Sequence, residues 1–338
     1  FSLLAPSKDI FARMGSQYSV PVVGNFDPPV TDDDGNAVAS AETVTVSLVG
    51  TSRGEKFAVA PGTEPGTWVV TLDGKSQTLE AESLNLSIDG GGGRDSLTLT
   101  ATAGDDRIEC SPGTATVTGD GYTISVRDVE TIVIDAGGGD NSATLHGSSR
   151  NDKLTASAMT AVLSGSGYSL KVLGAGSVAV DGAGGKDSAA LTGTSGNDAF
   201  FASLGSASLS GDGYAIGLTG FQTVQVKADS GGLDTATLVG STGNDKLTAS
   251  DKSSKLSGKG FLFQATGFDV VNVDGGGGSD TASVSGGLLD GPLSADLIGS
   301  LSDPYRTALW LSEVSTIGHK GKKVKPSAAD EVFGVFWK

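Results

Sequence analysis

The feature that most constrains this chain is an internal repeat of about 46 residues. A glycine-rich turn that ends in Asp or Asn recurs in steps of 46, 46, 47 and 46 residues, at Asp95, Asn141, Asp187, Asp234 and Asp280. A second turn, Gly-Asp or Asn-Asp in character, recurs in steps of 46, 46 and 47 residues, at Asp106, Asp152, Asp198 and Asp245. Two independent markers with one period define a repeat, and a period of this size is typical of solenoids, propellers and other arrays.

Within one repeat, taken as residues 86–131 with the segment that follows, short stretches alternate between apolar and polar residues. They lie at 97–99, 107–109, 115–117, 123–126 and 132–134, each bounded by Gly or Asp. Alternation with a period of two predicts strands. Leu97 and Leu99 should therefore point inward and Thr98 outward, and Ala or Leu occupies the inward positions of later repeats. A Gly-aromatic pair also recurs and predicts a stacked ladder of rings, formed by Tyr122, Tyr168, Tyr214 and Phe261.

These patterns predict an all-β chain that forms a parallel β-helix or β-solenoid of about five 46-residue repeats. Residues 41–286 would hold the solenoid, and residues 41–85 read as a degenerate first repeat with an insertion near residues 61–68. Atypical terminal repeats are expected because the end of a solenoid must be capped. A β-propeller is the alternative, since a unit of this length with four or five strands also suits a blade.

The two terminal segments do not follow the repeat. Residues 1–40 are expected to form an N-terminal cap or docking segment, in which Ser7 begins a short helix that carries Ile10 and Phe11. Residues 287–338 are expected to form a C-terminal cap or docking segment that is partly helical, because Leu309, Trp310 and Val314 have helical spacing. This segment combines a basic cluster with an apolar tail, and its candidate assembly residues are Lys320, Lys322, Lys323, Lys325, Phe333, Phe336 and Trp337.

Composition narrows the classes of partner and location. The formal net charge of -16 argues against a nucleic-acid partner. The single cysteine, Cys110, cannot form an internal disulfide, and no apolar run approaches the roughly 18 residues of a membrane span. Acidity and strands rich in Thr, Ser and Gly favour an extracellular or cell-surface protein. The start at Phe1, without a basic leader, suggests a processed product or a fragment.

Several turns resemble the glycine-rich calcium nonapeptide of hemolysin-type exported proteins. The stretches 90–98 (GGGGRDSLT) and 275–280 (GGGGSD) carry the resemblance, and Gly196-Asn-Asp198 and Gly243-Asn-Asp245 are similar more loosely. The whole unit, over residues 41–286, resembles repeat arrays in large extracellular proteins of planctomycete-type bacteria, as does the segment 20–29. The resemblance implies export and a β-solenoid. One departure is that the strong turns lie a full repeat apart, whereas calcium β-rolls stack nonapeptides in tandem.

The repeated carboxylates raise the question of calcium. If each repeat made one coil, like turns would stack about 4.8 Å apart, and the repulsion between neighbouring carboxylates would favour bound cations. If each repeat made two coils, like turns would lie about 10 Å apart and need no ion. Asp and Asn also favour such turns by bonding their own backbone. The candidate calcium turns are Asp95, Asp106, Asp152, Asp187, Asp198, Asp245 and Asp280, and a separate acidic run, Asp32-Asp33-Asp34-Gly-Asn36, is either a calcium loop or a solvated linker.

The sequence therefore favours a secreted structural or cell-surface assembly protein, not an enzyme. Its tail would dock on the next copy head-to-tail and form a fibre or lattice, with other cell-surface proteins or a glycan as further partners. The alternative is a calcium-stabilised adhesin stalk. A polysaccharide-acting β-helix enzyme is less favoured, because the repeated Asp residues are too regular for a catalytic set, and neither a Ser/His/Asp nor a Cys/His metal motif is present.

Overall fold

The computed structural model describes residues 43–250 and 252–284, together with the short strands at 10–13, 30–31, 37–38, 308–312, 316–319, 322–324 and 333–336. All regular elements in these residues are strands, so the predicted all-β class is confirmed. The chain divides into two compact units, residues 1–145 with 167–175 and residues 146–166 with 176–338. Among the described residues there is no helix with the length and apolar character needed to cross a membrane.

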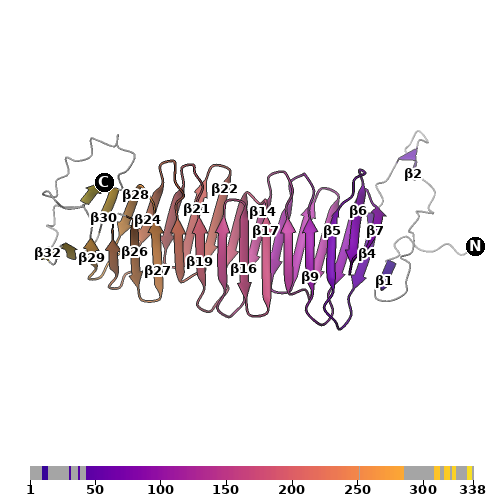
Figure 1. Cartoon of the computed structure of the whole chain (residues 1–338), viewed down its shortest axis with the longest axis horizontal. Coiled ribbons are helices and arrows are strands. Elements are labelled where there is room, and N and C mark those ends of the chain that lie inside the picture. The colour runs from indigo at the N-terminus through magenta and orange to yellow at the C-terminus, as the bar shows by residue number, and fades with distance from the viewer. Residues whose placement is uncertain are drawn as a thin grey trace, which may run out of the picture. The chain divides into compact units, whose positions relative to one another are not determined.

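The first unit is built from two sheets (Figure 1). Sheet I has the order β1-β4-β8-β12-β11-β10-β14 and sheet II the order β17-β13-β9-β5-β6-β7. The bounds of these strands and of the hairpin β2–β3 are β1 Ile10–Arg13, β2 Val30–Thr31, β3 Ala37–Val38, β4 Thr43–Val49, β5 Lys56–Pro61, β6 Thr67–Leu72, β7 Lys75–Glu80, β8 Ser83–Asp89, β9 Ser96–Thr100, β10 Arg107–Ser111, β11 Thr114–Gly119, β12 Tyr122–Arg127, β13 Thr131–Asp135, β14 Ser142–His146 and β17 Tyr168–Leu173.

The second unit has the same construction. Its sheet I has the order β18-β22-β21-β20-β24-β28-β30-β33 and its sheet II the order β32-β31-β29-β25-β26-β27-β23-β19-β15-β16. Their bounds are β15 Lys153–Ser157, β16 Thr160–Gly165, β18 Ser177–Asp181, β19 Ser188–Thr192, β20 Ala199–Ser203, β21 Ser206–Gly211, β22 Tyr214–Thr219, β23 Thr223–Lys227, β24 Thr235–Val239, β25 Lys246–Ala249, β26 Ser253–Gly258, β27 Phe261–Thr266, β28 Val270–Asp274, β29 Thr281–Val284, β30 Ala308–Ser312, β31 Thr316–His319, β32 Lys322–Val324 and β33 Phe333–Phe336.

The chain coils by crossing from one sheet to the other, and the strands of successive coils pair in parallel, as in β4–β8 and β5–β9. This parallel pairing identifies the fold as a β-solenoid and not as a propeller, whose blades are antiparallel. In chain order the strands fall into five groups of five, beginning at β4, β9, β14, β19 and β24. The predicted number of about five repeats is therefore confirmed.

Each repeat contains a fold-back that the sequence did not reveal. Strand β10 is placed beyond β8 by three strand positions, and β11 and β12 then return antiparallel, so that β12 pairs with β8. In the first unit the fold-back lies in sheet II for β5–β7 and in sheet I for β10–β12. In the second unit β20–β22 lie in sheet I and β25–β27 in sheet II. The fold-back thus alternates between the two sheets from one repeat to the next.

The core lies between the sheets and follows the predicted alternation. Leu97 and Leu99 are 1% and 0% exposed, whereas Thr98 is exposed. The equivalent inward pairs of the later repeats are buried as well, at Ala143 and Leu145, Ala189 and Leu191, and Ala236 and Leu238.

Three expectations are wrong. The helix predicted around Ile10 is the strand β1, which pairs in parallel with β4, and the helical spacing at residues 304–314 belongs in part to strand β30. Period alone cannot separate short apolar strands from helices. The predicted ladder of rings does not form, because Tyr122 and Tyr168 lie in different sheets of the first unit and Tyr214 and Phe261 in different sheets of the second.

The fold-back must close tightly over the turn beneath it, and Gly211 allows this. A Cβ at Gly211 would lie 2.4 Å from Asp198 Oδ1 and 2.5 Å from Tyr214 Cε1, while a Cβ at Gly217 would meet nothing within 4 Å. We expect Gly211→Ala to lower the free energy of unfolding by about 1–3 kcal/mol through overpacking. Gly217→Ala, measured beside it by urea denaturation, should be neutral or slightly stabilising; equal losses in both variants would contradict the packing described here.

Candidate functional site

The residues predicted as calcium ligands are the buried carboxylates of the turns that join the two sheets. Their side chains are 1–3% exposed in all seven cases. A carboxylate is rarely buried unless it is bonded or paired. The hydrogen bonds around each carboxylate therefore indicate what these residues do.

In the Gly-Asp turns, the aspartate caps its own turn. Asp198 Oδ2 accepts a hydrogen bond from Thr194 N at 2.7 Å, and Oδ1 accepts one from the Tyr214 hydroxyl at 2.6 Å. Asp106 has the same partners in its repeat, with the Tyr122 hydroxyl at 2.7 Å. Asp152 and Asp245 accept from the backbone and the hydroxyl of Ser148 and Ser241. At Tyr122 and Tyr214 the recurring aromatic residue thus donates a hydrogen bond to the turn.

A second set of bonds joins each turn to the turn of the next coil. Asp198 N donates to Asp234 Oδ1 at 2.9 Å, and Asp234 N donates to Asp269 Oδ2 at 2.8 Å. The same backbone-to-side-chain row connects Glu55, Asp95 and Glu130, and another connects Asp152, Asp187 and Gln222. Shorter rows connect Asp106 with Asn141 and Asp245 with Asp280.

These rows correct both arrangements expected for the carboxylates. Neighbours within a row are unlike turns, separated by 35 to 40 residues, rather than like turns of successive repeats. The exchange of sheets between repeats causes this, because it moves the equivalent turn to the opposite side of the coil. The third member of each row, Glu130, Gln222 or Asp269, was missed from the sequence. Its signal was the constant interval of 35 residues after Asp95, Asp187 and Asp234.

Asn141 shows what the position of the glycine-rich turn requires. Its Oδ1 accepts from Asp106 N at 2.8 Å, and its Nδ2 donates to Ala136 O at 3.1 Å and Gly138 O at 2.8 Å. Asp95 and Asp187 accept through Oδ1 in the same way, but their buried Oδ2 atoms have no hydrogen-bond partner. At this position an amide therefore forms hydrogen bonds through both of its polar atoms, whereas a carboxylate leaves one oxygen without a partner.

Burial changes the acidity of these carboxyls. Burial is the main cause that raises the pKa of Asp234 to about 6, and the negative charges of Asp198, Asp269 and Asp229 raise it further. The pKa of Asp187 is raised by burial and then by the charges of Asp152 and Asp181, although a backbone hydrogen bond opposes the change. The pKa of Asp95 is also raised, by burial first and by Glu55 and Glu130. At Asp95, Asp187 and Asp234 the folded chain thus favours the neutral carboxyl more than water does.

The turn carboxylates of the described residues do not converge on a common point that could hold a metal ion. Within residues 43–250 and 252–284 no group of three or more His, Cys, Asp or Glu side chains is arranged to hold a metal ion. The turn carboxylates best suited to a cation are Asp95 and Asp187, because each has one oxygen without a partner. The acidic run 32–36 lies outside the described residues.

The predicted assembly residues lie in or beside two terminal strands. Lys322 and Lys323 are in β32, which pairs antiparallel with β31. Phe333 and Phe336 are in β33, which pairs antiparallel with β30 of the same chain. Lys320, Lys325 and Trp337 lie outside the described residues.

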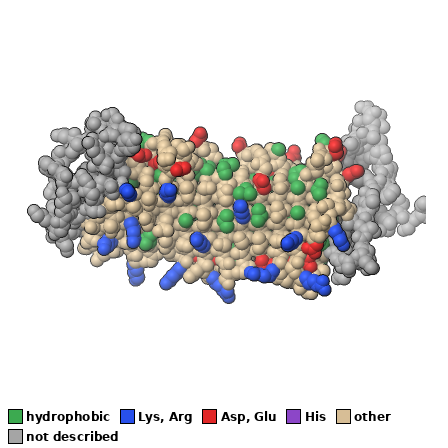
Figure 2. Space-filling view, viewed as in Figure 1, with side chains coloured by type: hydrophobic (Ala, Val, Ile, Leu, Met, Phe, Trp, Pro, Cys, Tyr) green, Lys and Arg blue, Asp and Glu red, His purple; other side chains and the backbone are tan. Residues whose placement is uncertain are grey.

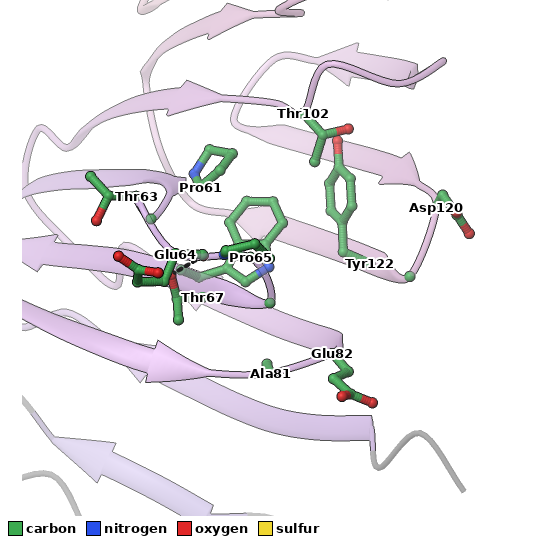
Figure 3. A pocket seen from close by; sticks show the side chains of 14 residues that line it. Pro61, Thr63, Glu64, Pro65, Thr67, Ala81, Glu82, Thr102, Asp120 and Tyr122 are labelled. Carbon is green, nitrogen blue, oxygen red and sulfur yellow. Dashed lines mark hydrogen bonds between the residues drawn. The ribbon is translucent and has the colours of Figure 1, made fainter. Parts of the chain in front are cut away.

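A pocket of about 350 Å³ opens in the first unit, where the insertion of the first repeat forms the β5–β6 turn (Figure 3). Its floor includes Trp68 and Tyr122, whose ring centroids lie 4.8 Å apart and which are both buried. Glu82 and Asp120 also line the pocket, and their carboxylates point away from the Tyr122 ring (Figure 3). Its lining contains none of the predicted calcium or assembly residues.

No protein-family model matches the chain, and no similar curated protein was found.

The unpaired oxygen at Asp187 generates a stability prediction. Asp187→Asn should raise the free energy of unfolding at neutral pH by about 1 kcal/mol, because the new amide can donate where the carboxylate oxygen has no partner. Chemical denaturation checks this. Asp198→Asn is the matched control and should destabilise, since both oxygens of Asp198 accept hydrogen bonds. A loss of stability in Asp187→Asn would mean that the carboxylate itself is needed, as it would be for a bound cation.

The raised pKa of Asp234 generates a pH prediction. A carboxyl whose pKa is higher in the folded than in the unfolded chain stabilises the fold as it becomes protonated. The Tm should therefore rise as the pH falls from 7 towards 5, across the pKa of about 6. The variant Asp234→Asn should show a smaller rise over the same interval. Identical pH profiles of the two proteins, followed by circular dichroism, would show that Asp234 does not titrate as described.

Proposed function

We propose that the chain is a secreted structural or cell-surface assembly protein, a solenoid subunit of a fibre or lattice. The observation that supports this most is the use of the repeated acidic residues. Each is buried in a turn, and at least one of its oxygens accepts a hydrogen bond from the backbone of its own turn or of the neighbouring coil. The repeated acidic residues thus stabilise the stacking of one coil on the next, as a structural element requires.

The ends of the sheets support assembly through terminal segments. An exposed terminal strand can pair with a strand of another chain. Strand β7 ends sheet II of the first unit, but it is protected: Lys75 lies opposite Leu72 and is exposed, so a charged side chain stands at this edge. Charges at an edge oppose further pairing. Sheet I ends at β1 in the first unit and at β33 in the second, and these strands are the better candidates for joining copies.

The proposal is tested by deleting residues 330–338, which removes β33. The full chain should form fibres or sheets in negative-stain images, and the truncated chain should not. Because the deletion also uncovers β30, circular dichroism must show that the truncated chain is folded. A second variant, Lys322→Glu with Lys323→Glu, leaves β33 in place and should weaken assembly. Polymers formed equally well by the truncated chain would rule out terminal docking, and compact monomers of the full chain would rule out a structural subunit.

A calcium-stabilised adhesin stalk is the second candidate, favoured by the unpaired Oδ2 atoms of Asp95 and Asp187. A divalent cation prefers such oxygen ligands. This function predicts a monomer whose Tm falls when a chelator replaces millimolar calcium, and it predicts that Asp187→Asn removes part of that dependence. A Tm that is the same in calcium and in chelator would exclude it.

A further inference from the structure

Exposed charges are distributed unevenly over the turns of the two units. The relevant turns are those that precede the parallel strands of one sheet, because all such turns lie on the same side of that sheet. We call the charged residues before the strands of sheet I in the first unit the acidic row, formed by Glu82, Asp120, Asp105 and Asp140. We call those at the start of the strands of sheet II in the second unit the basic row, formed by Arg150, Lys153, Lys186, Lys259 and Lys246.

Every side chain of both rows is exposed. Among the described residues the recorded ion pair joins Arg127 and Asp89, so neither row is neutralised by a described partner of opposite charge. The buried carboxylate in the turns of the acidic row is Asp106, whose oxygens already accept hydrogen bonds from Thr102 N and the Tyr122 hydroxyl. Figure 2 shows Lys and Arg side chains gathered along one border of the visible face. The basic row carries only cations, whereas the exposed Arg107 at the start of β10 lies beside Asp105, so that the acidic row is net negative but not of one sign.

The two rows match in spacing at three of their positions. In the first unit Glu82, Asp120 and Asp105 precede β8, β12 and β10, which are positions zero, one and three along sheet I. In the second unit Arg150, Lys186 and Lys259 precede β15, β19 and β27, which are also positions zero, one and three along sheet II. With strands about 4.8 Å apart, both sets are separated by about 5 and 14 Å. Position two is the antiparallel strand β11 in the first unit and the parallel strand β23 in the second. The remaining members differ, because Asp140 lies at position four and Lys246 at position five.

We propose that the basic row of one molecule docks on the acidic row of a second copy of this chain. The charges are opposite, the spacings agree at three positions, and the two rows are different surfaces, so the contact is heterologous. Contacts of this type need not close and can continue from copy to copy. This lateral contact goes beyond the proposed terminal docking, because it uses the turns of the solenoid and none of the terminal residues.

Charge reversal in the full chain tests the proposal. The first variant carries Arg150→Glu, Lys186→Glu and Lys259→Glu, and the second carries Glu82→Lys, Asp105→Lys and Asp120→Lys. Sedimentation velocity is measured at an ionic strength of about 10 mM and again at about 1 M, where the Debye length falls from roughly 30 to 3 Å. The wild type should associate at low ionic strength and dissociate at high ionic strength.

Each variant alone should remain unassociated through its turns, because both of its rows then carry the same sign. A mixture of the two variants should associate, since the intact acidic row of the first meets the intact basic row of the second. The matched control reverses three exposed lysines of the second unit that lie outside the basic row, Lys227, Lys252 and Lys255. This control should associate like the wild type, and circular dichroism should show all variants folded.

Three outcomes would overturn the proposal: a wild type whose association does not weaken at high ionic strength, reversal variants that keep the salt-dependent association of the wild type, or a mixture that does not regain it. The first would also be found if the basic row served an acidic polymer instead of a second copy. Terminal docking is distinguishable, because it would persist in both reversal variants and would disappear only on deletion of residues 330–338.

Discussion

The structure depends on one interaction, the hydrogen bond from the backbone N–H of a turn to the buried side-chain oxygen of the turn in the next coil. Asp152 N to Asp187 Oδ1, at 2.7 Å, is one example, and Asp245 N to Asp280 Oδ1, also at 2.7 Å, is another. A solenoid turn leaves backbone donors that no strand can pair, and burying them unpaired would cost free energy. The acidic side chains satisfy these donors and fix the register of one coil on the next.

The same interaction explains why the turns accept either Asp or Asn. An oxygen that accepts the backbone bond is required, while the second atom of the side chain is free to differ. Asn141 uses it as a donor to two carbonyl groups, whereas Asp187 leaves it unpaired. The acidic character of the repeat therefore has a structural cause that operates without any ligand, and a cation would act on the part of the site that this cause leaves unused.

The fold-back adds a second constraint. By returning through two antiparallel strands, two of the repeats bring a tyrosine hydroxyl over their own Gly-Asp turn, at Tyr122 and Tyr214. It also moves equivalent turns to opposite sides in successive repeats. Surface charges that recur along the chain are thereby divided between turns before the strands of sheet I and turns before the strands of sheet II. This division is the origin of the separate acidic and basic rows.

The sequence by itself determined the period, the strands, their inward residues and the turns, because alternation and Gly-Asp chemistry are local properties of the chain. Only the tertiary structure decided which turns become neighbours, that Glu130, Gln222 and Asp269 complete the rows, and that the aromatic residues do not stack. The reason is that a fixed period is compatible with several ways of coiling, and the choice among them is made by contacts between residues 35 or more positions apart.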